Sequence, residues 1–195
     1  LLQDGADTRN GVVWHTQGSG KTITMIMLTK MILRESMKPD SSIKRPRFVM
    51  VTDRINLDKQ IRDNFIHTQM SPHRAKTGKG LIELLKEDGN TVITALVNKF
   101  EAAVKQEYCN DSENIFVFID EGTQYGKLNI YMNRVLPNAV KIAFTGTPLM
   151  QKKPKNDKRD VMSAKDTYAK FGPLIDKYTL QDAIDDKVTV PIVYE

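Results

Sequence analysis

Cysteine is almost absent from this chain of 195 residues, in which Cys109 stands alone. A single cysteine excludes an internal disulfide framework and suits a reducing compartment. Long apolar runs are also missing, since no stretch approaches the roughly 18 residues that a membrane-spanning helix needs. The opening segment LLQDGADTRN lacks the basic and apolar regions of a secretory signal. We therefore expect a soluble, cytoplasmic protein with no membrane partner.

The remaining composition is that of an ordinary globular protein, with 40% hydrophobic and 27% charged residues. A chain of this length can bury the core of one sizeable domain. The formal net charge of +5 permits contact with nucleic acid. It does not establish such contact, because many basic proteins bind none.

Short apolar runs rich in Val, Ile and Phe alternate with longer segments of helical periodicity. The alternation predicts an α/β fold, with a mostly parallel sheet and helices on both faces. Ligands bind such sheets at the carboxyl ends of the strands. The predicted strands cover residues 11–16, 47–53, 91–96, 114–121 and 140–148, and the predicted helices cover 21–36, 56–67 and 79–88.

The segment HTQGSGKT follows the first predicted strand and opens the first predicted helix. Its glycines allow a sharp turn and a close approach to a ligand, and backbone N–H groups at a helix start bind anions. Lys21 can reach the β- and γ-phosphates of ATP, and the Thr22 hydroxyl can ligate Mg²⁺. The predicted nucleotide-binding residues are Gly18, Ser19, Gly20, Lys21 and Thr22.

The phosphate-loop prediction has one departure and one alternative. The strict pattern has glycine six residues before the lysine, where this chain has His15. The alternative is a glycine turn with a chance lysine. For Trp14, at the end of the strand, a place in the core is the favoured interpretation over a platform for base stacking.

The segment NIFVFIDEG supplies the carboxylates that hydrolysis needs at the end of another strand. We assign Asp120 to Mg²⁺ coordination through water and Glu121 to a general base or water-positioning role, beside Lys21. The alternative is a pair of solvated acids that close a strand. A further strand ends in FTGTP, where Thr145 and Thr147 could sense whether the phosphate site is occupied.

These motifs resemble the first motor domain of a superfamily 2 helicase or translocase, in which QGSGKT, DEG and TGTP occur in this order. More narrowly, the chain is similar to the restriction subunit of type I restriction-modification enzymes. This similarity spans nearly the whole chain, includes His15, and implies a RecA-like P-loop domain. It rests on the segments VVWHTQGSGKT, VTDRINLDKQI, TQYG, LPNAVKIAFTGTPL and FGPLIDKYTLQDAIDDKVTVPIVYE.

The resemblance implies ATP-driven translocation of double-stranded DNA toward cleavage, in a complex with modification and specificity subunits. A non-hydrolysing, nucleotide-dependent scaffold is the main alternative. Another superfamily 2 helicase domain is also possible. A small-molecule P-loop kinase is a more distant alternative, because TGTP and TDR have no obvious task there.

The segment TDR, residues 52–54, falls at a motif that touches the DNA backbone in this superfamily. Thr52 and Arg54 suit such contacts, because a hydroxyl and a guanidinium can both bond phosphate oxygens without reading bases. Thr94 and Lys99 could add similar contacts. The alternative for Arg54 is a solvated charge at the end of a strand.

The resemblance also sets the expected domain boundaries. Residues 1–150 form the motor domain, 151–166 a charged loop or insertion, and 167–195 a connector toward a second motor domain. Family members carry an N-terminal nuclease domain, which does not precede Leu1, and a second motor domain is expected after Glu195. We therefore expect a fragment with half of an ATPase site, which an arginine from the second domain would complete.

The segment DEGTQYG is shorter than its family counterpart, which usually has His-Arg before a polar residue and QYG. Here Gly122 is followed directly by Thr123. The missing histidine normally links the ATP site to TGTP. A true loss would favour the scaffold alternative, whereas a pair that is merely missing from the printed sequence would leave the motor intact.

Overall fold

The computed structural model describes residues 9–120, 126–148 and 167–190, apart from a few side chains. The described strands form one seven-stranded sheet in the order β3-β4-β2-β5-β6-β1-β7. Every strand pair in this sheet is parallel. The strands are β1 (Gly11–His15), β2 (Arg47–Thr52), β3 (His73–Ala75), β4 (Thr91–Leu96), β5 (Ile115–Asp120), β6 (Val140–Thr145) and β7 (Leu174–Tyr178).

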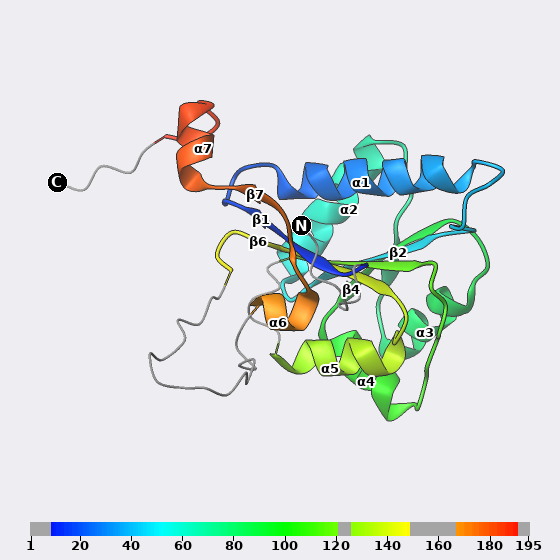
Figure 1. Cartoon of the computed structure of the whole chain (residues 1–195). Coiled ribbons are helices and arrows are strands. Elements are labelled where there is room, and N and C mark those ends of the chain that lie inside the picture. Colours follow the sequence, from blue (N-terminus) through cyan, green and yellow to red (C-terminus); the bar gives the residue numbers. More distant parts are fainter. Residues whose placement is uncertain (1–8, 121–125, 149–166, 191–195) are drawn as a thin grey trace, which may run out of the picture.

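Helices cover both faces of the sheet, with α1 and α2 on one face and α3 to α6 on the other (Figure 1). This arrangement confirms the predicted fold class. No helix in the described parts of the chain combines the length and apolar character needed to cross a lipid bilayer. The helices are α1 (Lys21–Ser36), α2 (Ile55–His67), α3 (Gly78–Lys86), α4 (Asn98–Lys105), α5 (Gly126–Val135), α6 (Thr167–Phe171) and α7 (Leu180–Asp185).

The core consists of one apolar cluster on each face of the sheet. Under α1 and α2, neighbouring strands contribute stacked phenylalanines, with ring centroids 5.5 Å apart for Phe48 and Phe116. On the other face, Leu81, Phe100 and Met132 pack against the strands. Central strands need apolar residues at successive positions because both of their faces are buried.

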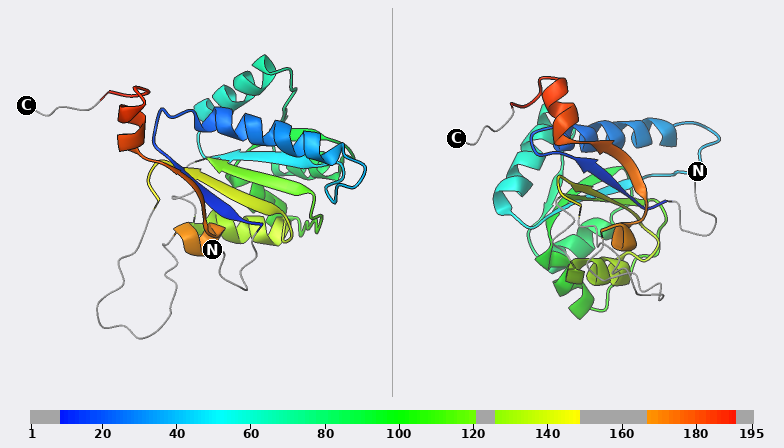
Figure 2. Two further views of the ribbon diagram at one scale, coloured as in Figure 1. Left: turned by 45° about the horizontal axis from the view of Figure 1, so that its top comes forward. Right: turned by 60° about the vertical axis from the view of Figure 1, so that its left-hand side comes forward.

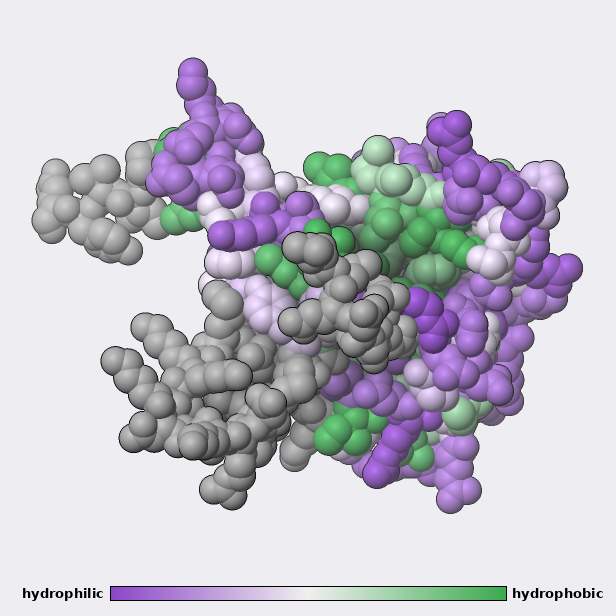
Figure 3. Space-filling view, viewed as in Figure 1, coloured by the Kyte–Doolittle hydropathy of each residue, from purple (hydrophilic) through white to green (hydrophobic). Residues whose placement is uncertain are grey.

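Helix α1 is apolar on its outer side as well as its inner side. Met25 and Ile26 are buried against the sheet. Ile23, Met27 and Met31 follow one another at steps of four residues and are exposed. Apolar side chains gather in this part of the surface in Figure 3. This two-sided character is the reason that the sequence of the helix is apolar nearly all round.

The C-terminal described residues join the same sheet before they leave it. Strand β7 pairs with β1, and Phe171 in α6 is buried in the core beneath the sheet. Residues 167–178, expected as part of the connector, therefore pack with the strands of the domain expected over residues 1–150. Helix α7 lies beyond the end of β7, apart from the helices that cover the sheet (Figure 2). The expected charged loop, 151–166, lies outside the described residues.

Candidate functional site

The phosphate loop connects the end of β1 to the start of α1. Gly18 and Gly20 have φ values of +81° and +85°, in the left-handed region that favours glycine. Between them, Ser19 Oγ donates a hydrogen bond to the Thr16 carbonyl at 2.6 Å. Gly20 is the N-cap of α1 and provides no side-chain cap. A helix start without a capping side chain leaves room for an anion.

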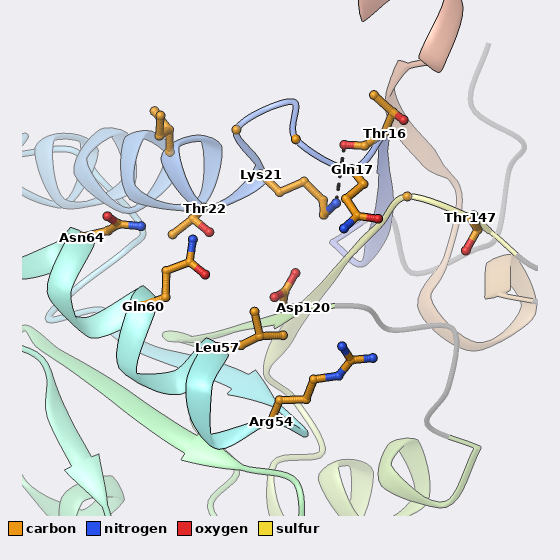
Figure 4. A pocket seen from close by; sticks show the side chains of 14 residues that line it. Thr16, Gln17, Lys21, Thr22, Arg54, Leu57, Gln60, Asn64, Asp120 and Thr147 are labelled. Atoms are coloured by element: carbon orange, nitrogen blue, oxygen red, sulfur yellow. Dashed lines mark hydrogen bonds between the residues drawn. The ribbon is translucent and has the colours of Figure 1, made fainter. Parts of the chain in front are cut away.

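Lys21 lies at the first position of α1 and reaches back over the loop. Its Nζ is 3.4 Å from the His15 carbonyl oxygen and 3.5 Å from that of Thr16 (Figure 4). These carbonyls hold the ammonium group at the mouth of the loop. A phosphate bound there would lie beside a fixed positive charge.

The loop forms one wall of a pocket with a volume of about 770 Å³. The other walls come from α2 and from the carboxyl ends of β5 and β6, the edge at which parallel sheets bind ligands. Most of the residues predicted for nucleotide binding meet here. The pocket is lined by Thr16, Gln17, Gly18, Gly20, Lys21, Thr22, Ile23, Arg54, Leu57, Gln60, Asn64, Asp120, Gly146 and Thr147.

The TGTP turn after β6 packs directly on the phosphate loop. A Cβ atom at Gly146 would lie 3.4 Å from the Gln17 backbone nitrogen and 3.7 Å from Lys21 Nζ. Thr145 is buried, and its Oγ1 accepts a hydrogen bond from the Thr147 backbone N–H at 3.2 Å. The turn therefore lies directly against the backbone of the loop and beside Lys21.

Helix α2 supplies pocket residues that the sequence analysis did not predict. Leu57, Gln60 and Asn64 are spaced by three and four positions, so they share one face of the helix. Figure 4 shows the two amides pointing toward α1. Amide side chains both donate and accept hydrogen bonds, so this face suits phosphate oxygens or ordered water. The sequence signals were a polar face beside the buried residues Ile61 and Phe65, and the place of Leu57 and Gln60 in the segment VTDRINLDKQI.

The residues predicted to contact DNA differ in their exposure. Thr52 and Thr94 are each only 1% exposed, and their hydroxyls do not reach the surface. Lys99 is half-buried at the start of α4. Arg54 is exposed, but it also lines the nucleotide pocket. The DNA contacts stay predictions, and Arg54, which also lies 3.7 Å from Asp53 Oδ1, is the most exposed of the four.

Part of the predicted catalytic machinery falls in segment 121–125, outside the described residues. This segment contains Glu121, the predicted general base, and the step from Gly122 to Thr123. The roles assigned to these positions stay predictions from the sequence.

His15 stands where the strict motif has glycine, and it pairs with the last strand of the sheet. Its Nε2 atom is 2.6 Å from Asp176 Oδ2. The hydrogen bond from His15 is the main cause that lowers the pKa of Asp176 below its ordinary value. The phosphate loop therefore begins at a buried histidine with a carboxylate partner.

The residues present fit a magnesium nucleotide. Thr22 and Asp120 both line the pocket and offer the oxygen ligands that Mg²⁺ prefers. Asp120 ends β5 and is 8% exposed, which places its carboxylate at the pocket rather than in open solvent. The glycine turn, the helix start and Lys21 together suit the phosphates.

Known proteins resemble this chain over nearly its whole length. Residues 2–195 match the family model described as SWI2/SNF2 ATPase. The endonuclease subunit of the HindI type I restriction enzyme of Haemophilus influenzae is 34% identical, over 97% of this chain and 18% of the relative. A Methanocaldococcus jannaschii protein, named as an MjaIXP type I restriction enzyme endonuclease subunit, is also 34% identical, over 97% of this chain and 17% of its own length. The chain thus spans less than a fifth of these curated relatives.

Solved structures share the fold at low sequence identity. A nuclease-deletion mutant of the Type ISP restriction-modification enzyme LlaGI, in complex with a DNA substrate mimic, superposes with a TM-score of 0.63 at 13% identity. That match covers 93% of this chain and 19% of the LlaGI chain. The helicase domain of Hef from Pyrococcus furiosus also gives 0.63, at 14% identity, over 95% of this chain and 38% of that one. The chain therefore belongs to the SWI2/SNF2 ATPase family, and the predicted resemblance to the restriction subunits of type I restriction-modification enzymes is confirmed.

Proposed function

We propose that this chain is the ATP-binding half of an ATP-dependent double-stranded DNA translocase in a type I restriction endonuclease. One observation carries the proposal: Lys21 and Thr22 at the start of α1 and Asp120 at the end of β5 line a single pocket beside the glycine loop. ATPases of the P-loop class bind the triphosphate with such a loop and its lysine, and hold Mg²⁺ with a hydroxyl and an acid.

Each side chain has a distinct part in the proposed reaction. Lys21 balances negative charge on the β- and γ-phosphates. Thr22 ligates Mg²⁺, and Asp120 holds it through water. Glu121, by its position in the sequence, orients the attacking water or accepts its proton. Phosphoryl transfer needs mainly positioning and charge stabilisation, and these groups supply both.

The assembly around the motor is also part of the proposal. The endonuclease-subunit names of the relatives and the small share of their length that the chain spans support a place in a larger subunit. We propose that a nuclease domain and a second motor domain belong to that subunit, and that the second domain completes the ATP site with an arginine. Modification and specificity subunits, double-stranded DNA and a cytoplasmic location complete the proposal.

A non-hydrolysing scaffold is a second candidate, supported by the direct Gly122–Thr123 sequence. Without a histidine to link the ATP site to TGTP, the domain could bind nucleotide and assemble a complex without turnover. Phosphate release by the intact subunit, measured with and without duplex DNA, separates the two. Release stimulated by DNA supports the motor, and binding without release supports the scaffold.

Lys21→Ala in the intact subunit tests the proposed site itself. Loss of one charge-assisted contact to phosphate should weaken ATP binding by about 10- to 100-fold and abolish DNA-stimulated phosphate release. Lys30→Ala is the matched control, because Lys30 is an exposed lysine on the same helix that does not line the pocket. ATP binding and phosphate release that survive Lys21→Ala unchanged would refute the phosphate-loop assignment.

A further inference from the structure

Strand β7 holds the segment of β1 that leads into the phosphate loop. The two strands are parallel, with Trp14 opposite Lys177 and His15 opposite Tyr178. The ladder continues beyond β1, since the Thr16 backbone N–H donates to the Tyr178 carbonyl at 2.9 Å. The first loop residue is therefore fixed by β7.

His15 connects β7 to the lysine of the loop. Its side chain is 11% exposed, its Nε2 lies 2.6 Å from Asp176 Oδ2, and its ring meets that of Tyr178 edge-on at 5.9 Å. Its carbonyl oxygen accepts the hydrogen bond from Lys21 Nζ at 3.4 Å. His15 thus connects the carboxylate of Asp176 on β7 to the ammonium group of Lys21, which is expected to bind the phosphates.

Trp14 makes a second connection, to the TGTP turn. Its Nε1–H donates to the Gly146 carbonyl at 3.1 Å. The Lys177 ammonium lies 4.9 Å from the centre of the indole ring, within the range of a cation–π contact. The indole is therefore held between β7 and the turn that packs on the loop.

The carboxyl end of β7 is fixed to α7. The Tyr178 hydroxyl donates to Asp186 Oδ2 at 2.9 Å. Thr179 and Asp182 form a reciprocal capping box at the start of α7. No flexible linker separates the strand from the helix, so a displacement of α7 would pull on β7.

We propose that Asp176 and Lys177 are positioning residues of the nucleotide site, which couple the phosphate loop and the TGTP turn to the β7–α7 segment. Neither side chain lines the pocket, so both act through His15 and Trp14. Through these contacts, a nucleotide that orders the loop also orders β7 and α7. The inference rests on the proposed ATP site and adds that the β7–α7 segment controls the geometry of that site.

The test measures binding of ATPγS with Mg²⁺ to the intact subunit by calorimetry. Asp176→Ala should weaken binding by about three- to tenfold, because His15 loses its partner and no longer fixes the carbonyl that holds Lys21. Asp176→Asn should restore most of the affinity, because the amide oxygen can still accept from the imidazole. Asp185→Ala is the matched control, since Asp185 is an exposed acid in α7 that bonds only within its own helix among the described contacts.

Trp14, the chain's single tryptophan, provides an independent optical readout. Saturating ATPγS should change its emission in the wild-type chain and in Asp185→Ala. The change should shrink in Asp176→Ala and in Lys177→Ala, because the indole is then uncoupled from the loop or from β7. Thermal unfolding of each variant, measured in parallel, separates positioning from simple stability.

The possible outcomes distinguish failure of the proposed ATP site from failure of the coupling through β7. An intact wild-type subunit that binds no ATPγS would overturn the ATP site and this inference with it. If the wild type binds and both Asp176→Ala and Lys177→Ala keep its affinity and its emission change, this inference alone is wrong. A lowered melting temperature with unchanged affinity would also overturn it, because the contacts would then be merely structural.

Discussion

Gly20 determines the geometry with which the loop passes into α1. Its φ of +85° lies where an L side chain is strained, although a Cβ there would have no neighbour closer than 3.7 Å. The cost of a substitution is therefore conformational rather than steric. We expect Gly20→Ala to destabilise the fold by about 1–2 kcal/mol, equivalent to about 2–8 °C in melting temperature for a chain of this size.

Gly20→Asn is the matched comparison, because asparagine adopts left-handed backbone more readily than alanine. It should lose less stability than Gly20→Ala, despite its larger side chain. Thermal unfolding followed by circular dichroism measures both. A greater loss in the asparagine variant would show that space, and not backbone conformation, limits this position.

At the residue scale, the sequence identified the pocket residues that belong to local motifs. Lys21 and Thr22 follow β1, and Asp120 ends β5, each at a spacing that has a chemical meaning. Gln60 and Asp176 lie in segments that resemble the family, but no chemical role was predicted for them, and only the packing of α2 and β7 brings them to the loop or to the residues before it. Such neighbours depend on tertiary structure, which local spacing does not encode.

Helix α2 is tied to the edge strand β3 by a buried carboxylate. Asp58 Oδ2 lies 2.8 Å from Arg74 Nε on β3 and 3.8 Å from Arg62 Nε, one turn along α2. Asp58 is fully buried, whereas both arginines are partly exposed. Asp58→Asn removes the charge and keeps the shape. We expect it to lower the free energy of unfolding by about 1–3 kcal/mol.

Asp63→Asn gives the control on the same helix, because Asp63 is exposed. That change should stay within about 0.5 kcal/mol of wild type. Urea unfolding of the two variants makes the comparison. Equal stabilities would mean that the ion pair with Arg74 does not hold β3 to the helix.

At the scale of elements, every strand predicted from apolar runs is present, and the strands that were missed are β3 and β7. β3 has the sequence HRA, and β7 has the largely exposed sequence LIDKY. Both occupy the edges of the sheet, where one side lacks a neighbouring strand. Edge strands can be short and polar, so they lack the continuous apolar pattern that revealed the central strands. Helices α4, α5 and α6 were also missed, because their periodicity was not recognised.

The whole molecule places its candidate chemistry along one edge of the sheet. The phosphate loop, Asp120, TGTP and the start of α2 all lie at the carboxyl ends of strands. The net charge of +5 is modest, so the proposed sequence-blind DNA binding would depend on where the cations lie. Arg54 lies at the carboxyl ends of the strands, and Arg134 lies at the end of α5, toward their amino ends. Both arginines are exposed.

This contrast gives a test of DNA binding that uses the full chain. If Arg54 contacts one backbone phosphate, Arg54→Ala should weaken binding to duplexes of any sequence and reduce the slope of log K against log salt by about 0.9. Arg134→Ala removes the same charge from the opposite edge and should leave the slope unchanged. Fluorescence anisotropy with two unrelated duplexes, over a series of salt concentrations, measures both quantities. An effect confined to one duplex would indicate base readout, and equal effects of the two variants would show that net charge, rather than a contact at Arg54, governs binding.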